Sequence, residues 1–225
     1  MELTEAVASR YSARAFQSTP VSAEVVERLL TRAAQSPSGG NLQPWHVYAL
    51  GGSALSALID DVASRLPSNP RGEPSEYSVY PEKLKEPYRT RRYRCGEDLY
   101  ASIGIGREDK MGRLMQFAKN LNCFGAPVCL FFAIDRAMGQ NQWAHLGMYM
   151  QTVMLLAREE GLHTCAQEAW STWHETVQRH LELPPELMLY CGMALGVADE
   201  QAPINRWRTE RAPLAEWATL KGFDK

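Results

Sequence analysis

Two arginines and a hydroxyl residue lie close together near the beginning of the chain. Arg10, Ser12 and Arg14 follow a short segment, residues 4–9, that is predicted to be helical. A planar guanidinium group matches pairs of phosphate oxygens, and a serine hydroxyl can add a further hydrogen bond. The three residues are therefore a candidate phosphate site. The alternative is that they are ordinary solvated surface residues, which is the commoner fate of arginine.

A second candidate site is the glycine-containing stretch that follows the next predicted helix, PSGGNLQP at residues 37–44. Glycine has no side chain, so the backbone here can approach a ligand closely. The amide side chains of Asn41 and Gln43 offer both donors and acceptors, which suits the edge of a flat heteroaromatic ring that carries carbonyl groups and ring nitrogens. The alternative interpretation is a plain turn between a helix and a strand.

A third group of candidate residues lies near the end of the chain. Arg206, Arg208 and Arg211 stand within six residues of one another. If the two ends of the chain meet, these arginines together with Arg10 and Arg14 would surround a dianionic phosphate. The spacing by itself does not require the ends to meet.

The elements that must position these residues alternate along the chain. Ser22 is a favourable helix cap, and an apolar stripe at helical spacing follows it as far as Ala33. The same reasoning predicts helices at 4–9, 22–35, 53–66, 108–122, 140–160 and 174–182, and strands at 45–50, 127–134, 163–168 and 187–198. The continuous apolar run at 127–134 is typical of a sheet covered on both faces. Alternation of strands and helices indicates a mixed α/β class.

Residues 67–107 are predicted to be the least regular part of the chain. They contain five prolines and a run of basic residues. A structureless stretch of this length in a compact domain is usually a functional loop, a lid or an arm that contacts a partner. We interpret it as a substrate lid in which tyrosines stack on an arene and basic residues attract anions, with Tyr80, Tyr88, Arg89, Tyr93 and Tyr100 as candidates. A solvated, variable insertion is the alternative.

The composition is that of a globular domain. Of 225 residues, 45% are hydrophobic and 22% charged, and the net charge of −2 gives no reason to expect a nucleic acid or a membrane as partner. We find no signal peptide and no membrane-length apolar run. Five widely spaced cysteines predict reduced thiols in a cytoplasmic protein, and the five histidines lack the spacing of a metal site.

Several blocks of the sequence resemble the FMN-dependent nitroreductase family. RYSARAF followed by SPSGGNLQPWHVY resembles its opening, and QEAWSTWHETVQRHLELPPE, LYCGMALGVAD and NRWRTERAPLAEW resemble its later blocks in the same order. The later blocks resemble a branch that acts on nitrobenzene-like compounds. The resemblance implies one α+β domain over residues 1–225, with a central mixed, mainly antiparallel sheet flanked by helices. It also implies an intertwined homodimer with one FMN at each end of the interface, in which residues 200–225 reach the partner subunit.

The resemblance assigns the three candidate sites to different parts of the FMN. Arg10, Ser12 and Arg14 would hold the phosphate and ribityl chain, and Arg208 and Arg211 would complete the phosphate site, with a weaker case for Arg206. Asn41 and Gln43 would face the pyrimidine edge of the flavin. Pro37, Ser38 and Gly39 would come from the other subunit.

A fourth segment enters only through the resemblance. Gln167, Glu168 and Ala169 follow a predicted strand and would lie under the flavin ring near N5. Family members often have a glycine near this turn, whereas this chain has Ala169 and Trp170. The departure leaves open which backbone N–H contacts N5.

The resemblance also implies the activity. NADPH or NADH would deliver hydride to flavin N5 and leave, and a nitroarene would then be reduced to the hydroxylamine in a ping-pong reaction, so no side chain is assigned a catalytic role. Quinone, free-flavin or enone reduction and reductive dehalogenation are alternatives on the same fold. A non-enzymatic flavin carrier and an interaction domain without a ligand are alternatives of a different class. The sequence does not distinguish NADH from NADPH.

Overall fold

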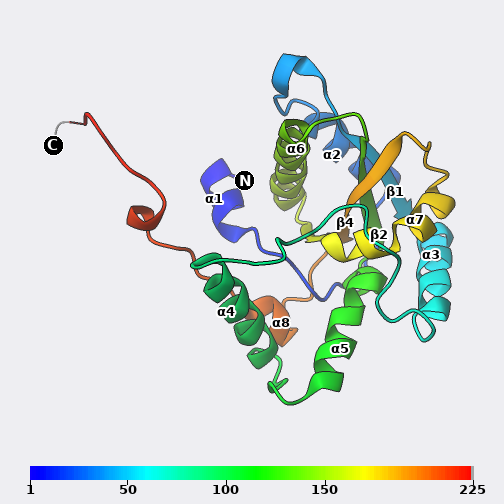
Figure 1. Ribbon diagram of the computed structural model, residues 1–225. Coiled ribbons are helices and arrows are strands. Elements are labelled where there is room, and N and C mark those ends of the chain that lie inside the picture. Colours follow the sequence, from blue (N-terminus) through cyan, green and yellow to red (C-terminus); the bar gives the residue numbers. More distant parts are fainter. Residues whose placement is uncertain (224–225) are drawn as a thin grey trace.

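The computed structural model describes residues 1–223 and is built around one four-stranded sheet (Figure 1). The strands are β1 (His46–Gly51), β2 (Val128–Asp135), β3 (His163–Gln167) and β4 (Leu187–Gly196). Their order in the sheet is β1-β2-β4-β3, and every neighbouring pair is antiparallel. The fold is therefore α+β. The α/β class inferred from alternation was wrong, because alternation along the chain does not fix the direction in which strands pair.

Helices cover both faces of the sheet. On one face, α2 (Ala23–Ala33) and α6 (Gln140–Glu159) pack through Leu29, Leu146 and Val153 against apolar residues of β2 and β4. On the other face, α3 (Gly52–Arg65) and α7 (His174–Leu181) pack through residues such as Leu58 and Val177. The two central strands are buried on both faces, as the apolar run at 127–134 indicated.

Local chemistry explains where the helices begin. Ser22 caps α2 by accepting a hydrogen bond from the N–H of Val25 at 3.4 Å, as predicted. Asp109 caps α5 (Lys110–Ala118) in the same way, accepting from the N–H of Gly112 at 2.8 Å. The predicted helix at 108–122 is shorter than expected because the chain turns into 3-10 helix after Ala118, with Cys123 and Phe124 in the left-handed region.

The segment 67–107 contains a regular helix, so the prediction of a structureless stretch was wrong. Helix α4 (Tyr88–Ala101) has no buried residue, which explains why no apolar periodicity revealed it. It is held by charged side chains instead. Arg113 of α5 makes a bidentate ion pair with Glu97 at 2.7 and 2.9 Å, and its guanidinium also lies over the ring of Tyr100.

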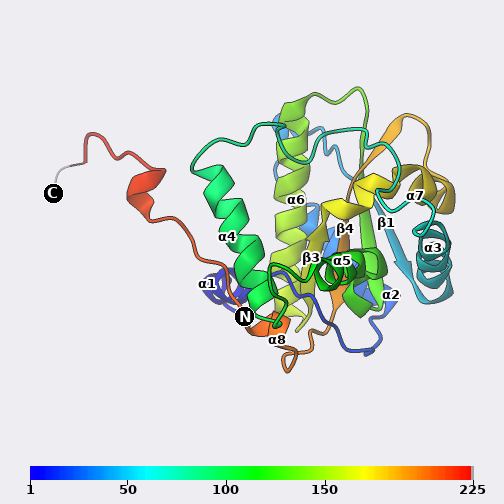
Figure 2. The same ribbon diagram turned by 60° about the horizontal axis from the view of Figure 1, so that its bottom comes forward.

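The two ends of the chain lie on the same side of the molecule. Helix α1 (Leu3–Ser9) packs against α6, and the short helix α8 (Pro203–Arg206) lies beside α4 in both views (Figures 1 and 2). Beyond α8 the chain leads away from the body and carries several exposed apolar side chains. Residues 224–225 lie outside the described part. Among residues 1–223, no helix has both the length and the apolar character needed to span a membrane.

Candidate functional site

A buried asparagine joins the two ends of the chain. The side chain of Asn205 accepts a hydrogen bond from the N–H of Arg14 at 2.7 Å and donates to the carbonyls of Ala15 at 2.7 Å and Asp199 at 2.8 Å. The N–H of Ala13 donates to Thr164 of β3 at 3.0 Å, so the N-terminal segment runs along the free edge of the sheet. The ends that carry the candidate phosphate residues therefore meet.

The meeting point concentrates positive charge. Burial and the nearby charge of Arg211 lower the pKa of the Arg10 guanidinium. Within residues 1–223, no ion pair with a carboxylate involves Arg10, Arg14, Arg208 or Arg211. A cluster of cations without carboxylates is the arrangement that an anionic ligand would neutralise. Arg206 differs, because its exposed side chain donates to the neighbouring Glu200 carbonyl and Gln201 side chain.

Strand β3 leads from this cluster to the fourth candidate segment. Ser12 forms a parallel bridge with Thr164 near the start of β3, and the strand ends at Gln167. The strand spans about 13 Å. The side chain of Gln167 is 1% exposed and donates to the carbonyl of Asn120 at 2.7 Å, while its Oε1 has no partner among the described residues. Glu168 follows on the surface, and desolvation raises the pKa of its carboxyl group.

Trp170 points away from the surface, into the core. Its fully buried ring meets Phe131 edge to face, and the absence of a side chain on Gly192 makes room for it. Two hydroxyls stabilise the turn that contains Trp170. Ser171 donates to the carbonyl of Glu168 and Thr172 donates to the carbonyl of Ala169, both at 2.8 Å. Trp170 thus anchors the turn and leaves Glu168 and Ala169 facing outward.

The glycine-containing loop lies elsewhere in the chain. Gly40, Asn41 and Gln43 have positive φ, and the N–H of Gln43 donates to Ser38 Oγ at 2.9 Å. Pro37, Gly39, Asn41 and Gln43 are exposed, whereas Ser38 is half-buried.

Helix α6 separates this loop from the arginines. The loop touches the beginning of α6, where the N–H of Gly39 meets His145 Nδ1 at 3.5 Å, whereas Ser9 touches its end through Arg158 Nε at 3.4 Å. Arg158 stands thirteen positions after His145, which corresponds to about 20 Å of helix. One chain therefore does not bring the loop and the arginine cluster together.

Arginine side chains lie over the rings of most of the tyrosines predicted to form a lid. Arg92 lies 4.1 Å over Tyr80, Arg107 lies 5.7 Å over Tyr93, and Arg113 lies 4.5 Å over Tyr100. Arg89 pairs with Glu86 at 2.7 Å, and Tyr88 is 60% exposed. The structure does not gather the four tyrosine rings into a single stacking surface.

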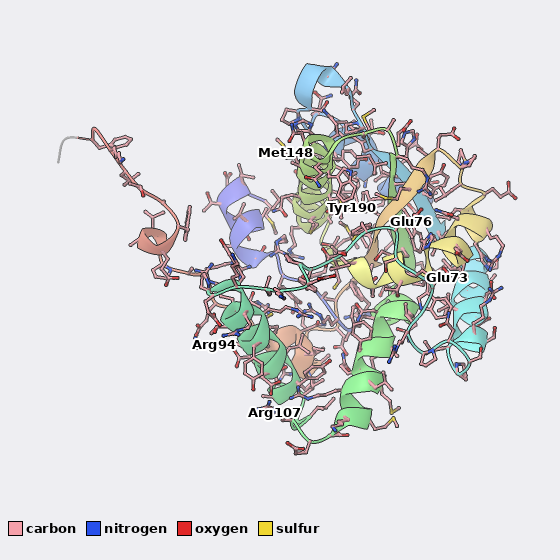
Figure 3. All side chains as sticks on the ribbon, viewed as in Figure 1. Glu73, Glu76, Arg94, Arg107, Met148 and Tyr190 are labelled. Atoms are coloured by element: carbon pink, nitrogen blue, oxygen red, sulfur yellow. The ribbon has the colours of Figure 1, made fainter. Side chains whose placement is uncertain are left out.

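Two acidic residues attach the first part of the segment 67–107 to α7. Glu73 accepts hydrogen bonds from the N–H groups of Glu175 at 2.7 Å and Thr176 at 3.1 Å, and Glu76 accepts one from Nε2 of Gln178 at 3.4 Å. Figure 3 shows both labelled glutamates beside this helix. Sequence reasoning missed these residues, and it also missed Asn205, because nothing in local spacing marks a contact between residues so far apart in the chain.

Comparison with known proteins agrees with this architecture. The model of the family described as "Nitroreductase family" matches residues 7–197, and the chain belongs to this family. The chain is 34% identical to the nitrobenzene nitroreductase of Ectopseudomonas oleovorans over 218 residues, which cover 97% of this chain and 96% of the relative. It is 35% identical to the 4-nitrobenzoate reductase of Pseudomonas putida over 222 residues, covering 97% and 95%.

Solved structures give the same result. The FMN and NADPH-dependent nitroreductase from Sphigopyxis sp. strain HMH is 45% identical and superposes with a TM-score of 0.96, covering 99% of this chain and all of that one. The FMN-dependent nitroreductase from Mycobacterium smegmatis in complex with NADPH has a TM-score of 0.92 at 26% identity, covering 97% of each chain. The expected family and the α+β fold of the single chain are thereby confirmed.

Proposed function

We propose that this protein is an FMN-dependent NAD(P)H oxidoreductase that reduces nitroarenes to hydroxylamines. The observation that carries the proposal is the cluster of unpaired arginines formed by both ends of the chain beside β3. Such a cluster fits a phosphate dianion. The names of two full-length relatives, a nitrobenzene nitroreductase and a 4-nitrobenzoate reductase, support the substrate class. The two similar structures described as FMN-dependent, one of them in complex with NADPH, support the cofactor and the electron donor.

The direction of β3 suggests how FMN would lie. Arg10, Ser12 and Arg14 would hold the phosphate and ribityl chain at the start of the strand, together with Arg208 and Arg211. The flavin ring would then reach the far end of the strand, where the segment of the buried Gln167 and the outward-facing Glu168 and Ala169 would contact it.

The glycine-containing loop would act from a second copy of the chain. We infer this from its position at the opposite end of α6 from the arginine cluster. In a homodimer, Pro37, Ser38 and Gly39 of one subunit would close over the flavin bound by the other. Asn41 and Gln43 belong to the same loop and would approach the pyrimidine edge with them.

The C-terminal tail supports the same homodimer. Leu214, Trp217, Leu220 and Phe223 are each more than half exposed, on a segment that extends away from the body (Figure 1). Apolar side chains arranged in this way gain stability by burial against a partner surface. We therefore infer that residues 200–225 wrap the partner subunit, within a single domain that spans residues 1–225.

The chemistry would come mainly from the cofactor. When bound, FMN would accept hydride from the reduced nicotinamide and pass it to the nitro group. Two NAD(P)H and two protons then convert one nitro group to a hydroxylamine and one water. The chain itself would bind and orient the flavin, and the segment 67–107 would cover the substrate. Because all five cysteines are unpaired, we place this reaction in the cytoplasm.

Anaerobic reduction tests this function. The purified protein is expected to show the absorbance of oxidised flavin, to bleach on addition of NADPH or NADH, and to regain its colour when nitrobenzene is added, with the hydroxylamine as product. Menadione, free FMN and a halophenol would be compared in the same assay. If the protein binds flavin but never bleaches, the proposed oxidoreductase activity is contradicted. If it bleaches but reduces only the comparison substrates, the proposal that nitroarenes are its substrates is contradicted.

A further inference from the structure

An aromatic ring supports one of the cofactor arginines. The guanidinium carbon of Arg208 lies 3.7 Å from the centre of the Tyr11 ring, which is a close cation–π contact. Tyr11 comes from the N-terminal segment and Arg208 from the C-terminal one, so this contact is a second connection between the two ends. A guanidinium that stacks on a ring keeps its in-plane N–H groups available for other partners.

The backbone fixes the rotation of the same guanidinium. Its Nη1 donates to the carbonyl of Asn205 and, at 2.9 Å, to the carbonyl of Trp207. Both of these hydrogen bonds use Nη1, and within residues 1–223 Nε and Nη2 of Arg208 donate to no backbone carbonyl. Stacking therefore sets the plane of the guanidinium, and the two carbonyls set its rotation within that plane.

The Tyr11 ring also contacts a buried histidine. The rings of Tyr11 and His163 are 5.2 Å apart and inclined by 58°. His163 is 5% exposed, and its Nε2 lies 2.7 Å from Nη1 of Arg158, so Nε2 is the acceptor and the imidazole is neutral. Arg158 also donates to the carbonyl of Leu162 at 2.9 Å, which holds it in place. The ring of Tyr11 thus contacts both a buried imidazole, which helps to hold it in place, and the guanidinium of Arg208.

We propose that Tyr11 is a positioning residue that holds the guanidinium of Arg208 in the orientation needed to bind the flavin phosphate. This inference rests on the proposed function, because it takes Arg208 to be a phosphate ligand. A flexible arginine loses conformational entropy when it binds a ligand, and a side chain already held in place loses less. The contribution of Tyr11 should therefore appear in affinity for the phosphate and not in affinity for the ring.

Comparison of FMN with riboflavin isolates that contribution, because riboflavin lacks only the phosphate. Dissociation constants would be measured by flavin fluorescence with the full-length protein after its own flavin has been removed by dialysis. Tyr11→Leu should weaken the binding of FMN by a factor of about ten and leave the affinity for riboflavin unchanged. Tyr11→Phe keeps the stacking ring and should bind FMN like the wild type. In an Arg208→Ala background, Tyr11→Leu should have no further effect.

The outcomes separate this inference from the proposed function. Equal weakening of FMN and riboflavin by Tyr11→Leu would show a general folding effect and would overturn the positioning role. The role is also overturned if Tyr11→Phe behaves like Tyr11→Leu, or if the Tyr11→Leu effect persists without Arg208. If the wild-type protein binds riboflavin as tightly as FMN, the result would instead contradict the phosphate site itself, and with it the proposed function.

Discussion

The backbone N–H of Arg14 donates to Oδ1 of Asn205 at 2.7 Å, across 191 residues of sequence. The amide nitrogen of the same side chain donates to two carbonyls, one from each end of the chain. Asn205 is 2% exposed, so these three hydrogen bonds have no competition from water. Arg10 and Arg211 belong to the two segments that it joins, and the charge of Arg211 contributes to the lowered pKa of Arg10.

Replacement of Asn205 should loosen the junction. Asn205→Leu leaves the N–H of Arg14 without a partner, and the carbonyls of Ala15 and Asp199 each keep only the backbone N–H that they also accept from. The free energy of unfolding should therefore fall by about 1–3 kcal/mol. Urea denaturation monitored by circular dichroism measures the change. Asn205→Asp keeps the acceptor for Arg14 but places a carboxylate oxygen against the two carbonyls, so its unfolding free energy should also lie below that of the wild type. Equal stability of all three proteins would show that the junction contributes nothing.

The buried His163 should make the protein sensitive to acid. Burial, together with the charges of Arg158 and Arg208, lowers the pKa of His163 to about 4. In the unfolded chain the pKa is about 6.5. Between these values the unfolded state binds more protons than the folded state, so stability is fully present above pH ~6.5 and is lost as the pH falls toward ~4, by at most about 3 kcal/mol.

A variant that cannot titrate provides the control for His163. His163→Gln retains an acceptor for Arg158 and should show a shallower fall in melting temperature between pH 6.5 and pH 4, the interval bounded by the two pKa values. Thermal unfolding of both proteins across that interval gives the comparison. Parallel curves would mean that other groups account for the whole acid sensitivity.

Gly192 should be intolerant of even one added methyl group. A Cβ at this position would lie 2.3 Å from Cδ1 of Trp170, and the buried ring has nowhere to move. Gly192→Ala should therefore cost about 1–3 kcal/mol of unfolding free energy and displace the turn that carries Glu168. Gly96→Ala in α4 is the matched control, because an added Cβ there meets nothing within 4 Å and should be neutral or stabilising. Comparable melting temperatures for the two variants would contradict this packing argument.

The carboxylate of Glu73 should hold the first part of the segment 67–107 in place. It accepts hydrogen bonds from two N–H groups at the start of α7, where a negative charge also interacts favourably with the helix dipole. Glu73→Ala should lower the unfolding free energy by about 1–2 kcal/mol and increase amide hydrogen exchange in residues 67–87. Glu82→Ala, at an exposed position in the same segment, should change neither. Unaltered amide hydrogen exchange in the Glu73 variant would show that other contacts hold this part of the segment.

The sequence predicted the local features of this fold well and its long-range pairing poorly. The cap at Ser22 and the buried run of β2 depend on neighbouring residues, and both appear as predicted. The antiparallel order of the strands depends on contacts between distant segments, which alternation does not encode. Helix α4 was missed for a related reason, since charged side chains such as Glu97 and Arg113 stabilise it without any buried stripe.

The candidate site divides in the same way. The chemistry of Arg10, Ser12 and Arg14 predicts a phosphate site, but only the fold shows that the C-terminal arginines approach them. Tyr11 stands inside the same short segment and was passed over, because its partner Arg208 is 197 residues away in the chain. The assignment of Gln167 came from the family resemblance alone, since a lone glutamine at the end of a strand has no distinctive pattern.

The preference for FMN over riboflavin in the Arg10→Ala/Arg211→Ala double variant tests the central claim most directly. If arginines from both ends of the chain bind the flavin phosphate, the wild type should prefer FMN strongly, and the double variant should lose that preference by about two orders of magnitude while its affinity for riboflavin stays the same. A double variant that keeps the wild-type preference for FMN would contradict the account, because the phosphate would then have to bind elsewhere.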